Sequence, residues 1–241
     1  MPEFHHRNEW THIMSNPYIY LTCLQKPGTD QIIINPSKMT SIAYLVLAIV
    51  LASLLSAHAG DPDITSDFLV PDGVTLDANL FTFRGLKKSL WGAPKDAPFK
   101  VTKASQVEFP GLAGQSVSYA TLQYASGGIN PPHTHPRSAE LLLVIQGSLE
   151  VGLVDSNNKL FTQVLQTGDM FVFPKGLVHY QVNKDPNYPA VALSAFGSAN
   201  AGTVVLPKTL FGNGLDKDVL AKSFKTDADT IDKLVKAATI G

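Results

Sequence analysis

Two histidines and a glutamate lie close together in the stretch GGINPPHTHPRSAE, residues 127–140. His133 and His135 are two positions apart, so on a β-strand both side chains would lie on one face. Glu140 has the opposite parity, so the intervening Pro-Arg-Ser-Ala must supply a turn or bulge before its carboxylate can face the same way. The stretch by itself is either a polar turn or half of a metal site.

A third histidine, His179, lies in FPKGLVHYQVN, where a Pro-x-Gly turn precedes it. It is the only other histidine after residue 59. One histidine alone is more often a surface or core residue than a ligand. All three, however, lie in two turn-bounded segments on adjacent predicted hairpins. Three imidazoles and the Glu140 carboxylate suit a divalent transition metal, with coordination positions left open for a ligand or redox partner.

The segments around these residues are predicted to be strands. From residue 106 to 206 short runs rich in β-branched and aromatic residues alternate with Gly, Pro, Asn and Asp, which is typical of strands joined by turns. About seven such runs favour an all-β antiparallel sandwich or barrel. A helical interpretation fails because Gly or Pro interrupts nearly every window.

The barrel is expected to have an irregular N-terminal arm, residues 60–105, and a C-terminal helical extension, residues 207–241. In that extension Thr226 can cap a helix whose first turn carries two aspartates. Apolar residues then follow at helical spacing on one face: Ile231, Leu234, Val235 and Ala238. This face either packs on its own barrel or docks on another subunit.

The first 59 residues differ from the rest. An apolar run ends in Ala57-His58-Ala59, so residues 39–59 predict a secretory signal peptide cleaved before Gly60. The run is shorter than the roughly 20 residues of a membrane span. Residues 1–38 are then an upstream extension absent from the mature protein, with Met39 as the natural start.

The composition limits which classes of partner and which cysteine chemistry the chain can have. Charged residues make up 16% of the chain, the formal charge is −1, and no basic block occurs, which disfavours a nucleic-acid partner. Cys23 is the only cysteine, and it lies in the leader. The mature chain therefore has no disulfide, and it has no Asn-x-Ser/Thr glycosylation sequon either.

The two histidine segments are similar to the two cupin motifs, and more narrowly to those of plant germins and germin-like proteins. The first motif, G-x5-H-x-H-x3,4-E-x6-G, is met by Gly127, His133, His135, Glu140 and Gly147. The second, G-x5-P-x-G-x2-H-x3-N, is met by Gly168, Pro174, Gly176, His179 and Asn183. The glycines are expected to permit turn conformations, and Asn183 to end its strand.

The resemblance implies a single β-jelly-roll barrel with a short C-terminal helical segment. It implies manganese bound by His133, His135, Glu140 and His179. It also implies a hexamer held partly by C-terminal helices, and secretion to the plant cell-wall space (the apoplast). Typical germins carry an N-terminal disulfide, which this chain lacks, so its N-terminal segment is expected to be held by packing alone.

The resemblance supports two redox activities, superoxide dismutase and oxalate oxidase. Oxalate-oxidising germins hold their substrate with two asparagines; one falls on Asn130, but the other falls on Ala120. Losing such a contact costs about 1–3 kcal/mol. We therefore expect superoxide dismutation, which generates hydrogen peroxide in defence or wall development, rather than oxalate oxidation. The alternative from another class is a non-catalytic binding, receptor-like or storage protein.

Overall fold

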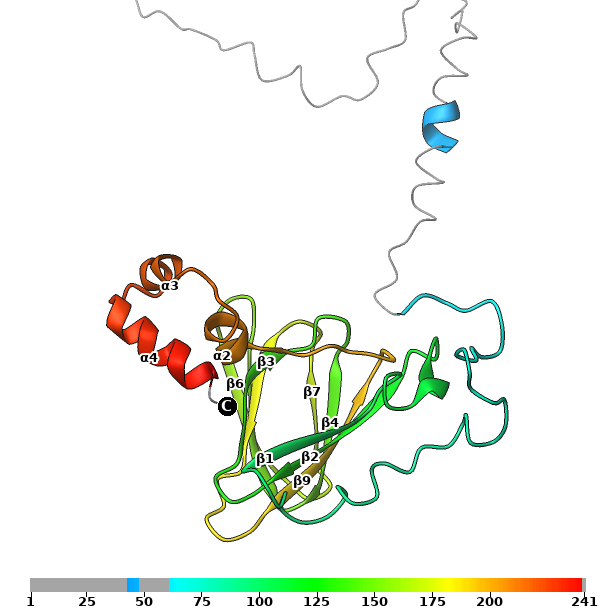
Figure 1. Ribbon diagram of the computed structural model, residues 1–241, viewed down its shortest axis with the longest axis horizontal. Helices are drawn as coiled ribbons and strands as arrows, with labels where there is room; N and C mark the ends of the chain where they lie inside the picture. The colour runs from blue at the N-terminus through cyan, green and yellow to red at the C-terminus, as the bar shows by residue number, and fades with distance from the viewer. Residues whose placement is uncertain (1–42, 48–60, 240–241) are drawn as a thin grey trace, which may run out of the picture. The chain divides into compact units, whose positions relative to one another are not determined.

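The structure is a computed structural model that describes residues 43–47 and 61–239 (Figure 1). The chain divides into two units, Met1–Ala57 and His58–Gly241. In the first, only a helical turn at 43–47 with exposed side chains is described. The predicted extension 1–38 lies outside the described residues, and so does most of the predicted signal peptide 39–59. Within the described ranges, no helix has the length and apolar character needed to cross a membrane.

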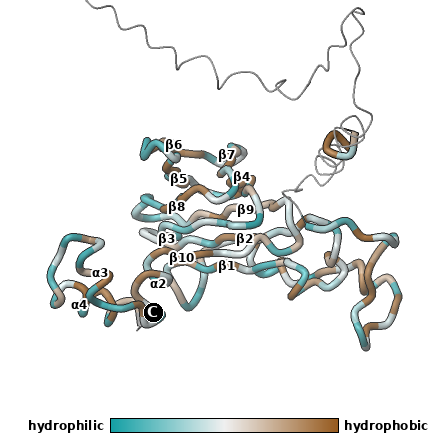
Figure 2. The backbone as a smooth tube through the Cα atoms, turned by 90° about the horizontal axis from the view of Figure 1, so that it is seen from above, coloured by the Kyte–Doolittle hydropathy of each residue, from teal (hydrophilic) through white to brown (hydrophobic). Residues whose placement is uncertain are grey.

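The second unit consists mainly of two antiparallel five-stranded sheets, which confirms the all-β prediction. One sheet has the order β1-β2-β9-β4-β7: Phe99–Ala104, Ser118–Tyr124, Ala190–Phe196, Glu140–Gln146 and Met170–Phe173. The other has the order β10-β3-β8-β5-β6: Val204–Val205, Ile129–Thr134, Val178–Val182, Ser148–Val154 and Leu160–Gln166. Figure 2 shows the two sheets face to face, with β3 opposite β2 and β6 opposite β7.

The core lies between the sheets, and the strand alternation builds it. On β4, Leu142 and Val144 are fully buried whereas Leu141 is 42% exposed. Glu140 has the same parity as the two core residues and is also buried. The inner face of one strand therefore carries both apolar core residues and a polar group of the candidate site.

The N-terminal arm contains more regular structure than its sequence predicts. Its described part is mostly turns and bends, but its last residues form β1, which pairs with β2 along its whole length. Phe99 of β1 packs on the buried Tyr124 ring, with 4.8 Å between ring centroids. A short 3-10 helix, Pro110–Leu112, follows β1. Burial of Phe99 against the barrel explains why a segment with a weak local strand pattern joins the sheet.

Hydrogen bonds fasten the arm to the barrel, so the expectation that packing alone holds it is wrong. The Asp61 carboxylate accepts hydrogen bonds from Ser198 Oγ at 2.7 Å and from the Ala199 N–H at 2.5 Å. Gln123 Nε2 on β2 donates to the carbonyl oxygens of Trp91 and Gly92 at 3.3 and 3.1 Å.

The C-terminal extension forms three helices beside the barrel, α2 (Leu206–Phe211), α3 (Lys217–Phe224) and α4 (Ala228–Thr239) (Figure 1). Asp227, not Thr226, caps α4: its Oδ1 accepts the N–H of Thr230 at 2.8 Å. On the predicted apolar face Ile231 is fully buried, but Leu234 is 41% exposed. Part of that face therefore remains open to solvent in the single chain.

Candidate metal centre

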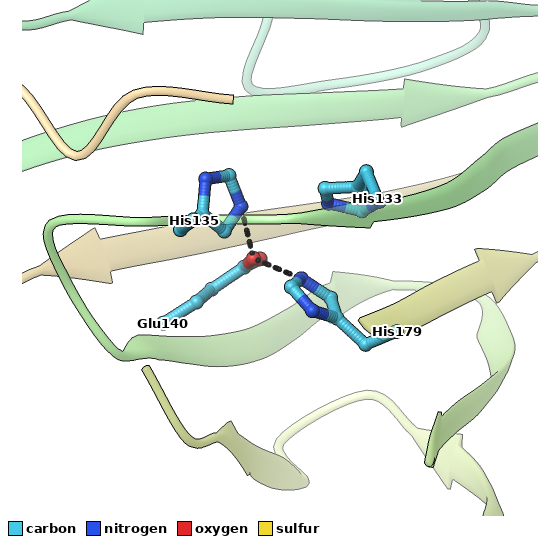
Figure 3. A group of neighbouring side chains, drawn as sticks. All are labelled: His133, His135, Glu140 and His179. Atoms are coloured by element: carbon cyan, nitrogen blue, oxygen red, sulfur yellow. Dashed lines mark hydrogen bonds and ion pairs between the residues drawn. The ribbon is translucent and has the colours of Figure 1, made fainter. Parts of the chain in front are cut away.

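The three histidines and the glutamate come together inside the barrel, from both sheets (Figure 3). His133 lies on β3 and is the direct pairing partner of His179 on β8. His135 lies just beyond the end of β3, and Glu140 is the first residue of β4. The predicted turn between His135 and Glu140 therefore carries the chain from one sheet to the other.

The four side chains are buried, and their candidate ligand atoms all lie within 4.8 Å of one another. Oε2 of Glu140 lies 3.0 Å from Nε2 of His135 and 3.1 Å from Nε2 of His179. Figure 3 shows these contacts as dashed lines, with the His133 ring beside them.

Backbone carbonyls fix the tautomers of the three histidines of the centre. Nδ1 of His133 lies 2.8 Å from the Pro131 oxygen, and Nδ1 of His179 lies 2.8 Å from the Leu177 oxygen. Nδ1 of His135 lies 2.6 Å from the Gly202 oxygen. A carbonyl oxygen only accepts, so each Nδ1 must carry a proton. The rings therefore direct their Nε2 atoms to the centre, as metal-binding histidines do.

The centre thus gathers three imidazole Nε2 atoms and a carboxylate, and Nε2 of His135 and of His179 each lie within hydrogen-bond distance of Oε2 of Glu140. Burial is the largest cause that lowers the pKa of His133, to about 4, so this ring is neutral near pH 7. Burial raises the pKa of Glu140, but hydrogen bonds and charge from His135 and His179 outweigh burial and hold it far below its usual range. Three imidazole nitrogens and one ionised carboxylate fit a divalent transition ion.

Three further side chains support these residues, and the sequence reasoning missed all of them. Ser194 on β9 donates its Oγ–H to Oε1 of Glu140 at 2.5 Å, which leaves Oε2 facing the histidines. Phe173 stacks on His179 with 4.3 Å between centroids, and Phe196 meets His135 edge-on at 4.9 Å. Ser194 and Phe196 lie more than 50 positions from Glu140 in sequence, and Phe173, which directly precedes Pro174, is not a fixed position of the second motif.

The motif residues around the site form turns, as expected. Gly147 and Gly176 have φ angles of 76° and 78°, which β-carbon-bearing residues adopt only with strain. The Gly176 N–H also donates to the His135 carbonyl at 3.1 Å. Asn183 is fully buried and does more than end its strand: its Nδ2 donates to the carbonyl oxygens of Ala125 and Tyr188 at 3.0 and 2.8 Å.

A pocket of about 430 Å³ leads to the centre, and His133, His135 and Glu140 line it. Asn130 and Ala120 line it as well. Nδ2 of Asn130 donates to Gln181 Oε1 at 2.7 Å and lies 3.5 Å from Nε2 of His133. Much of the remaining wall is apolar, with Phe99, Val101, Leu122, Phe196 and Val205.

Comparison with known proteins gives consistent matches. Residues 97–232 match the family described as Cupin. Germin-like protein 9-3 of rice, Oryza sativa subsp. japonica, is 55% identical over 202 residues, which cover 81% of this chain and 94% of the relative. Germin-like protein 9-1 of rice is 52% identical over 203 residues, covering 82% of this chain and 81% of the relative.

A solved structure of an oxalate oxidase superposes with a TM-score of 0.68 at 33% identity. The match covers 75% of this chain and 99% of the oxalate oxidase chain.

Proposed function

This chain belongs to the cupin superfamily as a plant germin-like protein, and on that premise we propose that it is a secreted manganese protein that dismutates superoxide. The observation that carries the proposal is the arrangement of His133, His135, Glu140 and His179. Three Nε2 atoms and a carboxylate oxygen meet in a buried space, and each Nδ1 faces a backbone carbonyl. A bound divalent cation would displace the protons shared between Glu140 and the imidazoles of His135 and His179.

Manganese bound there would supply alternating one-electron oxidation and reduction, by which two superoxide anions and two protons become one O₂ and one H₂O₂. The protein must hold the ion, leave a path to it and exclude other reactions. The two phenylalanines that pack on His135 and His179 fix those rings and keep the site apolar around them. The pocket gives a small anion access to the centre.

Secretion to the apoplast is proposed from residues 39–59, whose apolar run and small-residue ending are typical of a signal peptide. A role in defence or wall development would follow from peroxide made there. Peptide mapping of the secreted protein tests this assignment, and any peptide from before Gly60 would contradict it.

Oxalate oxidation is the weaker redox candidate, although an oxalate oxidase is structurally similar. Ala120 lines the pocket and is buried, and its methyl group cannot donate a hydrogen bond to a carboxylate. Without that contact, Asn130 is the only one of the two asparagine positions that can orient a dianion. We expect the manganese-loaded protein to release little peroxide from oxalate; brisk turnover would overturn the argument from Ala120.

A non-catalytic binding or storage role is the alternative, and the pocket volume favours it. A space of about 430 Å³ is in the range that holds organic ligands and is larger than superoxide needs. Such a protein would keep the barrel and its metal.

Purified protein assayed for superoxide dismutation with and without manganese separates the two functions. We expect activity only in the manganese-loaded protein, and none in a His135→Ala variant. That variant should also lose metal and thermal stability, because bound metal stabilises only the folded state. Equal metal content in variant and wild type would contradict the ligand assignment, and an inactive, fully metallated wild type would leave the binding role.

A further inference from the structure

We infer that Lys103 is the residue that attracts and holds anions in the pocket, in the place where Ala120 provides no contact. The inference rests on the proposed function of the same site and specifies how its anionic substrate is recognised. It assigns Lys103 a role as a positioning residue for the substrate, not as a ligand of the ion.

The strand register places Lys103 beside the position of interest. Lys103 on β1 is the direct antiparallel partner of Ala120 on β2. Side chains directly opposite each other on one face of such a pair have Cβ atoms about 5 Å apart. Lys103 and Ala120 both line the pocket, so the lysine side chain starts from the wall next to the small methyl group.

The alternation along β1 directs Lys103 to the pocket. Phe99, Val101 and Lys103 share one parity and all line it. Lys100 has the opposite parity, is exposed and is not part of the lining, so its side chain lies on the other face of the strand. Among the described residues that line the pocket, Lys103 is the only Lys or Arg.

Glu108 is one carboxylate that bears on this charge, and Glu140 also lines the pocket. Burial raises the pKa of the Glu108 carboxyl group. Hydrogen bonds from Ser105 and the nearby charge of Lys103 outweigh burial, so the pKa lies below its usual value. Oε2 of Glu108 accepts from the Ser105 N–H at 3.1 Å and from Ser105 Oγ at 2.5 Å. These bonds keep the Glu108 carboxylate on Ser105, in the turn that follows β1. The flexible Lys103 side chain can therefore reach toward the pocket.

The chemistry of the lysine selects the class of ligand. An ammonium group on a four-carbon stem is a mobile point charge without the fixed geometry of an amide or guanidinium. It attracts any small anion, including oxalate, but it orients a two-ended dianion poorly. Lys103 beside Ala120 would therefore draw superoxide into the pocket without supplying the orientation that oxalate oxidation needs.

The test compares Lys103→Met with Lys100→Met, which removes the same charge from the same strand on the opposite face. Metal content and thermal unfolding are measured first to show that both variants load and fold. At low ionic strength we expect the superoxide rate constant to fall about threefold to tenfold in Lys103→Met and to stay near wild type in Lys100→Met. The difference should shrink at about 0.5 M salt, where charges are screened over a few ångströms. Glu108→Gln should raise the rate.

Azide binding is a readout that does not depend on activity. It is measured on the manganese-loaded protein by calorimetry and by the electron paramagnetic resonance of the ion. Lys103→Met should weaken azide binding by a similar factor. If wild type shows no dismutation but this azide difference remains, the proposed activity fails and the role of Lys103 stands. Equal rates and equal azide affinities in the two lysine variants, or a loss that salt does not change, would overturn the inference.

Discussion

At the scale of single residues, the Glu140 carboxylate is held by three side-chain partners. One oxygen accepts from Ser194 and the other faces two imidazoles. Burial of an ionised carboxylate is costly unless partners compensate it. The serine therefore does more than fill space, because it decides which oxygen points to the centre.

Removal of that serine hydroxyl gives the first prediction. Ser194→Ala frees Oε1 of Glu140, so the carboxylate can rotate away from the ion, and manganese affinity should fall about 10-fold to 100-fold. Competition with a chelator of known affinity measures it. Ser126→Ala is the matched control, because it removes an exposed hydroxyl bonded to the Asp185 carbonyl. Unchanged affinity in Ser194→Ala would show that packing alone holds the carboxylate.

At the scale of elements, the turns between strands set the register that brings the ligands together. Gly147 joins β4 to β5, and a β-carbon there would lie 2.6 Å from the Pro189 oxygen. Gly168 joins β6 to β7 with a φ angle of 96°, but a β-carbon there would have nothing within 4 Å. Both glycines have a positive φ angle, but only at Gly147 would a β-carbon clash with neighbouring atoms.

Alanine at each glycine separates the two effects. Gly168→Ala should lower the free energy of unfolding by about 1–2 kcal/mol, the cost of a left-handed conformation. Gly147→Ala should lose about 1–3 kcal/mol more, because the methyl group also overpacks against backbone. Denaturant unfolding of the manganese-loaded proteins measures both. Equal losses of unfolding free energy in the two variants would mean that the chain near Pro189 moves to make room for the methyl group.

The first described residues of the N-terminal arm are held by the Asp61 carboxylate. Asp61 holds Ser198 and Ala199, in the loop that leads to Gly202, whose carbonyl binds the His135 ring. Asp61→Asn should weaken this clamp, cost about 1–3 kcal/mol of stability and expose the arm to limited proteolysis. Asp63→Asn, at an exposed position, should change neither. Arm cleavage at the wild-type rate in Asp61→Asn would contradict the clamp.

At the scale of the whole molecule, the C-terminal helices carry apolar side chains that a single chain leaves open. Val219 and Phe224 on α3 are 57% and 51% exposed, and Leu234 on α4 is 41% exposed. Such a group favours docking on another subunit, in line with the hexamer that the resemblance to germins implies.

A charge on this face tests the assembly. Val219→Asp should shift sedimentation toward smaller species without unfolding the protomer, because the residue is already exposed and buries little within its own chain. Val107→Asp, at a position 71% exposed outside the helices, is the control and should sediment as wild type. A wild type that sediments as a monomer, or a Val219→Asp oligomer of unchanged size, would count against a helical interface.

The sequence by itself determined the chemistry of the site and the class of the fold. Ligand type, spacing of two along a strand, and turn residues between apolar runs are local properties, so the four candidate ligands and the strand-rich barrel could be predicted from His133, His135, Glu140 and His179 and their surroundings. The tertiary structure alone decided what surrounds them. The hydrogen bond from Ser194, the Gly202 carbonyl behind His135 and the pairing of Lys103 with Ala120 depend on which strands become neighbours and in which register. That choice is made by burial of apolar faces between distant segments, and no short stretch of sequence records it.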